Sequence, residues 1–199
     1  MDIINPSDTE LDILCEELSR NIVADFKPDL VIGIATGGKI VAEKVNEHIK
    51  CPIIILKRQR TGTIKKNKLN LQKFLSILPE HFNNKLRKAE ALFNEFWYEV
   101  NDQALKENEV ILISGSISKI KSAFKIIVID DAVDSGSTLK DTLNFLKELA
   151  NKNTIIKTAC INITYVNPGV KPDFFIYKRC MVRYPWAIDF RKKNEKSRI

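Results

Sequence analysis

Three aspartates and a hydroxyl-rich loop follow one apolar stretch of the sequence. Asp130 and Asp131 come directly after the β-branched run 126–129. The loop that follows consists of Asp134, Ser135, Gly136, Ser137 and Thr138. Carboxylates suit sugar hydroxyls or a magnesium ion, whereas hydroxyls and main-chain NH groups at a helix start suit phosphate. These residue types together predict a site for a molecule such as a ribose 5-phosphate.

The flanking residues indicate which elements position this loop. The run 126–129 is typical of a buried strand, and an apolar residue recurs at helical spacing behind the loop, at Leu139, Leu143, Leu146 and Ala150. A capped strand-to-helix turn would explain the loop without any ligand, because Ser and Asp are common helix caps. Three aspartates exceed what capping needs, which favours a binding site.

A second strand, loop and helix lie earlier in the chain. The apolar run 31–34 is followed by Ala35, Thr36, Gly37, Gly38 and Lys39. Apolar residues then recur at helical spacing from Ile40 to Ile49. Residues 33–39 also satisfy the G-x-x-x-x-G-K pattern of a P-loop nucleotidase. Against that alternative, Ile40 offers no hydroxyl for magnesium, and an NTPase leaves the loop 134–138 unexplained.

The segment 126–138 resembles the phosphoribosyl diphosphate (PRPP) motif of type I phosphoribosyltransferases: an apolar strand, two acids, two spacers, an acid and a Thr/Ser/Gly loop. The resemblance implies that Asp130 and Asp131 contact the ribose hydroxyls or a bound Mg²⁺, and that residues 134–138 hold the 5-phosphate. It also places Asp134 near the base, because the matching acid of the purine enzymes lies there and is proposed to transfer a proton of the base ring. The implied reaction is Mg²⁺-dependent transfer of a phosphoribosyl group from PRPP to a nitrogen acceptor, with release of pyrophosphate.

The second loop resembles the family's pyrophosphate loop, which ends in a glycine pair. The resemblance implies that residues 35–38 meet the pyrophosphate through their main-chain NH groups. Thr36 stands where purine enzymes usually carry Arg or Lys. We therefore expect the positive charge for pyrophosphate to come from Lys39, Lys57 or Arg58.

The C-terminal part resembles the base-binding hood of the hypoxanthine-guanine and xanthine-guanine enzymes, at residues 172–174 and 184–186. Asn167 stands where those enzymes place a lysine, and Met181, with Val182 beside it, stands where they place an aromatic residue. The resemblance thus implies a purine-like acceptor contacted by these three residues, and leaves its identity open. Tyr184 and Trp186 are either hood residues of structural importance or acceptor contacts.

Positive charge is concentrated in two segments. The net charge of +7 comes from +7 over residues 57–79 and +4 over residues 191–198, so the rest of the chain nets −4. Basic clusters attract phosphate backbones, which leaves open a second kind of function. That alternative is a non-catalytic regulator that senses PRPP or a nucleotide and binds nucleic acid. Aromatic residues do not alternate with the basic ones, so nucleic acid is not the favoured partner.

The remaining patterns predict an α/β fold with a mainly parallel twisted sheet and helices on both faces. A capping box at Ser7 and Glu10 opens an amphipathic helix that continues to Ile22. A longer amphipathic helix is predicted from its apolar spacing, at Phe82, Leu86, Ala89, Phe93, Phe96 or Trp97, and Val100. We expect that apolar face to pack on the core, although a dimer contact or a lid would use the same pattern.

These elements suggest one domain over residues 1–199, with a basic loop and helical insertion at 62–108 and a hood and basic tail at 165–199. The first residues, Met-Asp-Ile-Ile-Asn-Pro, lack the basic start and apolar core of a signal peptide. The four cysteines form no C-x-x-C pair. We expect a cytoplasmic protein that forms a homo-oligomer and has no membrane partner.

Overall fold

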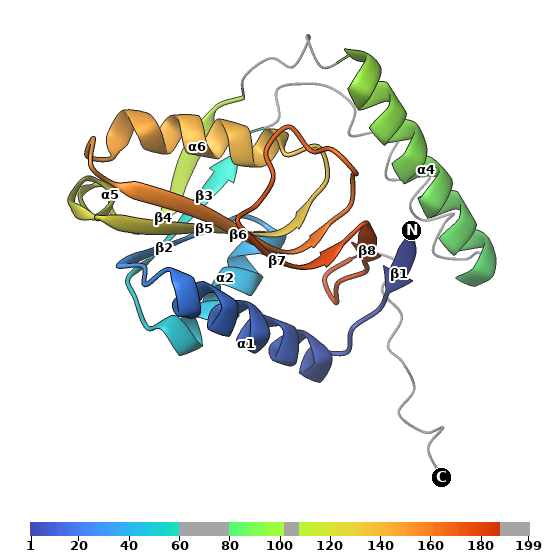
Figure 1. Cartoon of the computed structure of the whole chain (residues 1–199), viewed down its shortest axis with the longest axis horizontal. Coiled ribbons are helices and arrows are strands. Elements are labelled where there is room, and N and C mark those ends of the chain that lie inside the picture. Colours follow the sequence, from blue (N-terminus) through green and yellow to red (C-terminus); the bar gives the residue numbers. More distant parts are fainter. Residues whose placement is uncertain (60–79, 102–107, 188–199) are drawn as a thin grey trace.

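A computed structural model describes residues 1–59, 80–101 and 108–187. Its centre is a six-stranded sheet with the order β4-β3-β2-β5-β6-β7 (Figure 1). All neighbouring strands run parallel except β4, which is antiparallel to β3 at the edge. The predicted α/β class with a mainly parallel sheet is confirmed.

Most elements coincide with the sequence patterns. The sheet strands are β2 (Leu30–Ile34), β3 (Ile53–Arg58), β4 (Val110–Ser114), β5 (Lys125–Val133), β6 (Ile155–Ile163) and β7 (Phe174–Lys178). The helices are α1 (Asp8–Asp25), α2 (Gly37–Ile49), α4 (Glu80–Asn101), α5 (Ile117–Ser122) and α6 (Ser137–Leu149). The predicted capping box closes α1: the main-chain NH of Ser7 donates to Glu10, and that of Glu10 donates to the Ser7 hydroxyl. None of the described helices is long and apolar enough to cross a membrane.

Helices cover both faces of the sheet: α1 and α2 lie on one face, and α5 and α6 lie on the other (Figure 1). Strand β2 is buried along its whole length, and β5 from Ile126 to Asp130, as expected for strands with helices on both sides. Each face therefore has its own core, one built on α1 and α2 and the other on α6.

The strand order reverses between β2 and β5, because α2 leads from β2 to β3 on one side and the chain later returns to β5 on the other. In parallel α/β sheets, ligands bind at such a reversal, beyond the carboxyl ends of the strands. Both loops that the sequence singles out, 35–38 and 134–138, lie at this position.

Three features differ from the sequence-based expectation. Strand β5 continues through Asp130 and Asp131 to Val133, and the short helix α5 begins at Ile117, within residues 114–118, for which the sequence predicts a turn. A second, two-stranded parallel sheet joins β1 (Asp2–Ile4) to β8 (Cys180–Val182). Strands of three residues show too few alternations to be found by periodicity.

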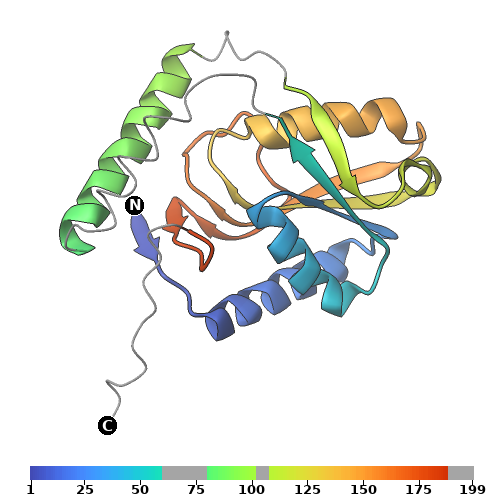
Figure 2. The ribbon, with the colours of Figure 1, turned by 180° about the vertical axis from the view of Figure 1, so that it is seen from behind.

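Helix α4 is the predicted insertion helix, and it lies beyond the carboxyl ends of the central strands, near β8 (Figure 2). It attaches through a polar stripe. Glu95 is buried and accepts hydrogen bonds from the Val166 main-chain NH at 2.6 Å and from Arg179 at 2.5 Å. On the same side, Asn84 accepts a hydrogen bond from Arg183 at 2.8 Å.

The expectation that the apolar stripe of α4 packs on the core is wrong for its described side chains. Leu86, Phe93, Phe96 and Trp97 are exposed. The surface that α4 contacts presents the Val166 main-chain NH and the side chains of Arg179 and Arg183. Because these donors bind Glu95 and Asn84, the polar side of the helix faces inward. The basic loop from Arg60 onward, the C-terminal basic tail, and the side chains of Phe82 and Val100 lie outside the described residues.

We expect Glu95→Ala to lower the free energy of unfolding by about 2 kcal/mol, because the Val166 NH and the Arg179 guanidinium lose their acceptor. Urea denaturation measures the loss, and hydrogen exchange should show faster exchange in α4. Glu90→Ala on the exposed side of the same helix is the matched control, with a change of about 0.5 kcal/mol or less. Equal effects of the two substitutions would contradict the anchoring role of Glu95.

Candidate functional site

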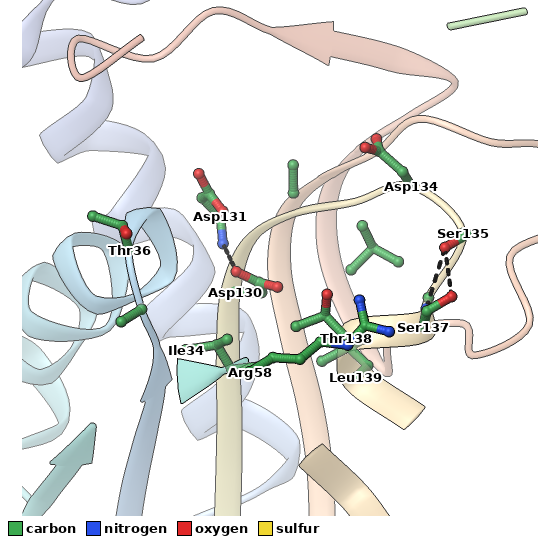
Figure 3. A pocket seen from close by; sticks show the side chains of 14 residues that line it. Ile34, Thr36, Arg58, Asp130, Asp131, Asp134, Ser135, Ser137, Thr138 and Leu139 are labelled. Carbon is green, nitrogen blue, oxygen red and sulfur yellow. Dashed lines mark hydrogen bonds between the residues drawn. The ribbon is translucent and has the colours of Figure 1, made fainter. Parts of the chain in front are cut away.

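A cavity of about 520 Å³ opens at the carboxyl ends of β2 and β5. Figure 3 shows Asp130 and Asp131 on one side, Ser135 and Ser137 on the other, and Arg58 between them. The full lining consists of Ile34, Ala35, Thr36, Arg58, Asp130, Asp131, Ala132, Val133, Asp134, Ser135, Gly136, Ser137, Thr138 and Leu139. The structure thus brings all residues of the predicted 134–138 loop to one cavity with both aspartates of β5.

Asp130 is the most buried carboxylate of the cavity, with 9% of its surface exposed. Burial raises the pKa of Asp130 well above its usual value, and the neighbouring Asp131 charge raises this pKa further. Its Oδ1 accepts a hydrogen bond from the Asp131 main-chain NH at 3.0 Å. Without a ligand, these two effects favour the protonated form of the Asp130 carboxyl. A bound cation or hydroxyl donor would instead favour the ionised form.

The glycine pair that starts α2 permits a close approach to these aspartates. A Cβ at Gly38 would lie 2.6 Å from Asp130 Oδ1 and 2.9 Å from the Ile129 carbonyl oxygen. A Cβ at Gly37 would lie 1.9 Å from Asp131 Oδ2. The helix start, with its partial positive charge, therefore lies directly against both carboxylates. Sequence reasoning linked these glycines only to pyrophosphate and missed this packing role.

The loop 134–138 is built around Gly136, which caps α6 with a positive φ of 79°. The Ser135 and Ser137 hydroxyl oxygens lie 2.8 Å apart, and the Ser137 main-chain NH donates to Ser135 Oγ at 3.3 Å. On its outer side, the Gly169 main-chain NH donates to the Ser135 carbonyl at 2.9 Å. The result is a braced turn of hydroxyls at a helix N-terminus, an arrangement suited to an anion.

Only some of the residues that the sequence analysis assigned to pyrophosphate line the cavity. Ala35 and Thr36 line the cavity and are joined by a cis peptide bond. Arg58 also lines the cavity, but its Nε donates to Asp141 of α6 at 2.6 Å, and both side chains are largely buried. Lys39 pairs at the surface with Glu43, and neither Lys39 nor the exposed Lys57 belongs to the lining.

The residues assigned to the acceptor also lie outside the lining. Asn167 is exposed, Met181 is half-buried in β8, and Val182 is buried beside it. Val182 belongs to the core on the α1–α2 side, and the pairing of β8 with β1 was not expected from the sequence.

Two aromatic residues near the C-terminal end of the described chain hold Asp131 in place. Trp186 Nε1 donates to Asp131 Oδ2 at 3.2 Å. The Tyr184 hydroxyl lies 2.7 Å from both the Asp131 carbonyl oxygen and Asn162 Oδ1, and its ring stacks on Trp186 with centroids 4.7 Å apart. The Tyr-Pro-Trp segment was interpreted from the sequence as part of a hood. The hydrogen bond from Trp186 to Asp131, 55 residues earlier, could not be predicted from the neighbouring residues.

The P-loop interpretation is wrong. Gly33 lies inside β2, and only Ala35 and Thr36 separate β2 from α2. Two residues leave no long glycine-rich loop to wrap a triphosphate, and Lys39 is turned to the surface with Glu43.

The chain matches the model of the phosphoribosyl transferase domain over residues 7–190. It belongs to this family. No curated protein shows significant sequence similarity to it. The fold is similar to that of a purine phosphoribosyltransferase from Pyrococcus horikoshii, with 19% identity, a TM-score of 0.59, and coverage of 94% of this chain and 95% of the other.

Two further solved structures share the fold of this phosphoribosyl transferase domain. The xanthine-guanine-hypoxanthine phosphoribosyltransferase of Helicobacter pylori has 13% identity, a TM-score of 0.60, and coverage of 94% of this chain and 95% of the other. A hypothetical protein from Neisseria gonorrhoeae with bound ppGpp has 16% identity, a TM-score of 0.56, and coverage of 93% and 89%. At such identities the likeness extends to the fold and not to the substrate.

We expect Asp130→Asn to stabilise the ligand-free chain. The pKa of Asp130 is higher in the folded than in the unfolded chain, so ionisation above about pH 4 progressively disfavours the fold. The amide cannot ionise, and the melting temperature should rise by about 2–4 °C at neutral pH. Calorimetry without metal should show this gain shrinking towards about pH 4.

The matched control for that measurement is Asp12→Asn, because Asp12 is an exposed aspartate on α1 that pairs with Lys44. It should give no comparable gain in melting temperature. A lower melting temperature for Asp130→Asn, or a gain that does not change with pH, would show that burial does not disfavour the ionised carboxylate.

Proposed function

We propose that this protein catalyses the Mg²⁺-dependent transfer of a phosphoribosyl group from PRPP to a nitrogen acceptor, a purine-like base, with release of pyrophosphate. The observation that supports this most strongly is the pairing of two unlike walls across one cavity. Asp130 and Asp131 form one wall, and the hydroxyl loop 134–138 at the start of α6 forms the other. A ribose that carries a 5-phosphate has groups for both.

In this proposal the sugar lies between the walls. The hydroxyls of Ser135, Ser137 and Thr138 and the first NH groups of α6 bind the 5-phosphate. The carboxylates of Asp130 and Asp131 accept hydrogen bonds from the ribose hydroxyls. Trp186 and Tyr184 keep Asp131 in position for this contact through their hydrogen bonds to its side chain and carbonyl.

Asp130 and Asp131 are also the residues that would hold Mg²⁺. Among the described residues, no group of three or more carboxylate, histidine or cysteine side chains is arranged to hold a metal ion by itself. Mg²⁺ commonly binds through one or two carboxylates together with substrate phosphates and water, so the pair fits a metal that arrives with PRPP. A bound Mg²⁺ would supply positive charge to the departing pyrophosphate.

The main chain of Thr36, together with the start of α2, is assigned to the pyrophosphate. The Ala35 NH is already used, because it donates to the Leu56 carbonyl oxygen at 2.8 Å. Lys39 and Lys57 gain no support from their positions outside the lining, so the proposal relies on main-chain NH groups there. In the transfer, the bond from the sugar C1 to pyrophosphate breaks as the acceptor nitrogen bonds to C1. The acceptor proton passes to Asp134, and positioning and charge supply the rate acceleration.

A sensor without catalysis is the second candidate, and one contact favours it. Arg58, a cation in the described cavity lining, is already paired with the buried Asp141. That pairing makes Arg58 less able to stabilise a leaving pyrophosphate. A regulator of this kind would bind PRPP or a nucleotide, and would use the basic segments to bind nucleic acid.

One experiment separates the two candidates. The purified chain is incubated with Mg²⁺, PRPP and one member of a library of purine, pyrimidine and amine acceptors, and pyrophosphate release is measured. A catalyst releases pyrophosphate with at least one acceptor, and the purine-like bases should give the highest rates. PRPP binding by calorimetry without release for any acceptor would favour the sensor, and absence of both would reject the site assignment.

We expect the double variant Asp130→Asn/Asp131→Asn to lose about 10³-fold or more of its PRPP-dependent pyrophosphate release, because both contacts to the ribose and metal lose their charge. Circular dichroism should show an intact fold. Asp12→Asn, remote from the cavity on α1, is the control and should keep full activity. Unchanged release by the double variant would refute the assigned roles.

A further inference from the structure

Helix α4 is amphipathic, but its polar side meets the body of the protein and its apolar side is exposed, the reverse of an ordinary surface helix. The side that meets the body carries Asn84, Ala91, Glu95 and Tyr98, of which Glu95 and Ala91 are buried. The opposite side exposes Leu86, Leu92, Phe93, Phe96 and Trp97, here called the outer face. At 100° per residue the mean directions of these two sets lie about 170° apart on a helix. The apolar outer face therefore points away from the described body of the protein.

The outer face is an apolar, aromatic patch of a size that often marks an interaction site. Phe93, Phe96 and Trp97 are 63%, 63% and 59% exposed, and Phe93 stacks on Trp97 with centroids 6.3 Å apart. An aromatic side chain carries about 150–250 Å² of surface, so these three and the two leucines expose on the order of 500 Å². Two such faces together reach about 1,000 Å², the lower range of a specific interface.

The charges along α4 indicate the orientation of a partner. Its first half, residues 80–90, contains Lys85, Arg87 and Lys88 together with Glu80 and Glu90, and its second half contains Glu95 and Glu99. Glu95 faces inward and pairs with Arg179, so the acidic charge that a partner could meet near the end of the helix is that of Glu99. A second α4 lying antiparallel would bring Lys85 and Lys88 of each copy towards Glu99 of the other, and would also oppose the two helix dipoles.

We infer that a second copy of this chain docks on the outer face of α4, with the two helices antiparallel about a two-fold axis. A two-fold contact is self-complementary, which suits an apolar face with Lys85 and Lys88 towards one end and Glu99 towards the other. Helix α4 lies at the periphery of the described structure in both views (Figures 1 and 2). No residue of α4 lines the cavity between β2 and β5, so this dimer leaves that cavity open.

The experiment measures self-association of the full chain by sedimentation equilibrium. The unsubstituted chain should be a dimer, and Phe93→Glu/Trp97→Glu should raise the dimer dissociation constant by about 100-fold or more. Phe124→Glu is the matched control, since Phe124 is 67% exposed just before β5, at the far end of the sheet. It should leave the dissociation constant unchanged. Circular dichroism verifies that α4 stays helical in each variant.

The charge order gives an independent test of orientation. Lys85→Gln/Lys88→Gln should weaken an antiparallel dimer a few-fold, because the attraction to Glu99 of the other copy is lost. In a parallel dimer the same change would relieve repulsion between two basic halves and strengthen association. That strengthening would overturn the antiparallel arrangement.

Hydrogen exchange of α4 completes the test. Protection of the α4 amides should rise with protein concentration in the unsubstituted chain and stay low in Phe93→Glu/Trp97→Glu. A chain that is monomeric at every concentration but has a protected α4 would overturn the inference, since its own residues would then cover the outer face. A dimer that survives Phe93→Glu/Trp97→Glu would overturn it equally, because the interface would lie elsewhere.

Discussion

The contact between the start of α2 and the end of β5 is the constraint on which the site depends. Asp130 can be buried only because the peptide units at Gly37 and Gly38 approach its strand more closely than any side chain would permit. The helix start offers partial positive charge to both carboxylates, which offsets part of the cost of burying them. The same contact fixes the position of the loop at Ala35 and Thr36, and with it one side of the cavity.

Local patterns in the sequence were sufficient to predict most of the fold and one half of the site. The β-branched runs ending at Ile34 and Ile129 each precede a polar loop and an amphipathic helix, and the structure places both loops at one edge of the sheet. That information is local, because a strand and its following loop are continuous in sequence. The 134–138 loop was therefore predicted with all its members, and the structure brings them to one cavity.

What the sequence could not reveal depends on partners distant in the chain. Arg58 is paired with Asp141, 83 residues away, and this contact removes a charge that sequence reasoning had left free for pyrophosphate. Trp186 reaches Asp131 across 55 residues, and β1 pairs with β8 from opposite ends of the chain. Amphipathicity predicted α4 as a helix, but Glu95 and its arginine partner decided which face turned inward.

The charge of the cavity links substrate binding to the metal. Its described lining contains Asp130, Asp131 and Asp134, while the positive charge of Arg58 is compensated by Asp141. Such a cavity repels a free polyanion, because the local field is negative and the walls exclude part of the water that would screen it. Under the proposed function, PRPP in complex with Mg²⁺ would bring its own compensating cation to the two β5 carboxylates. Because burial and the Asp131 charge raise the pKa of Asp130, a cation bound there would favour its ionised form and so couple metal and substrate binding to pH.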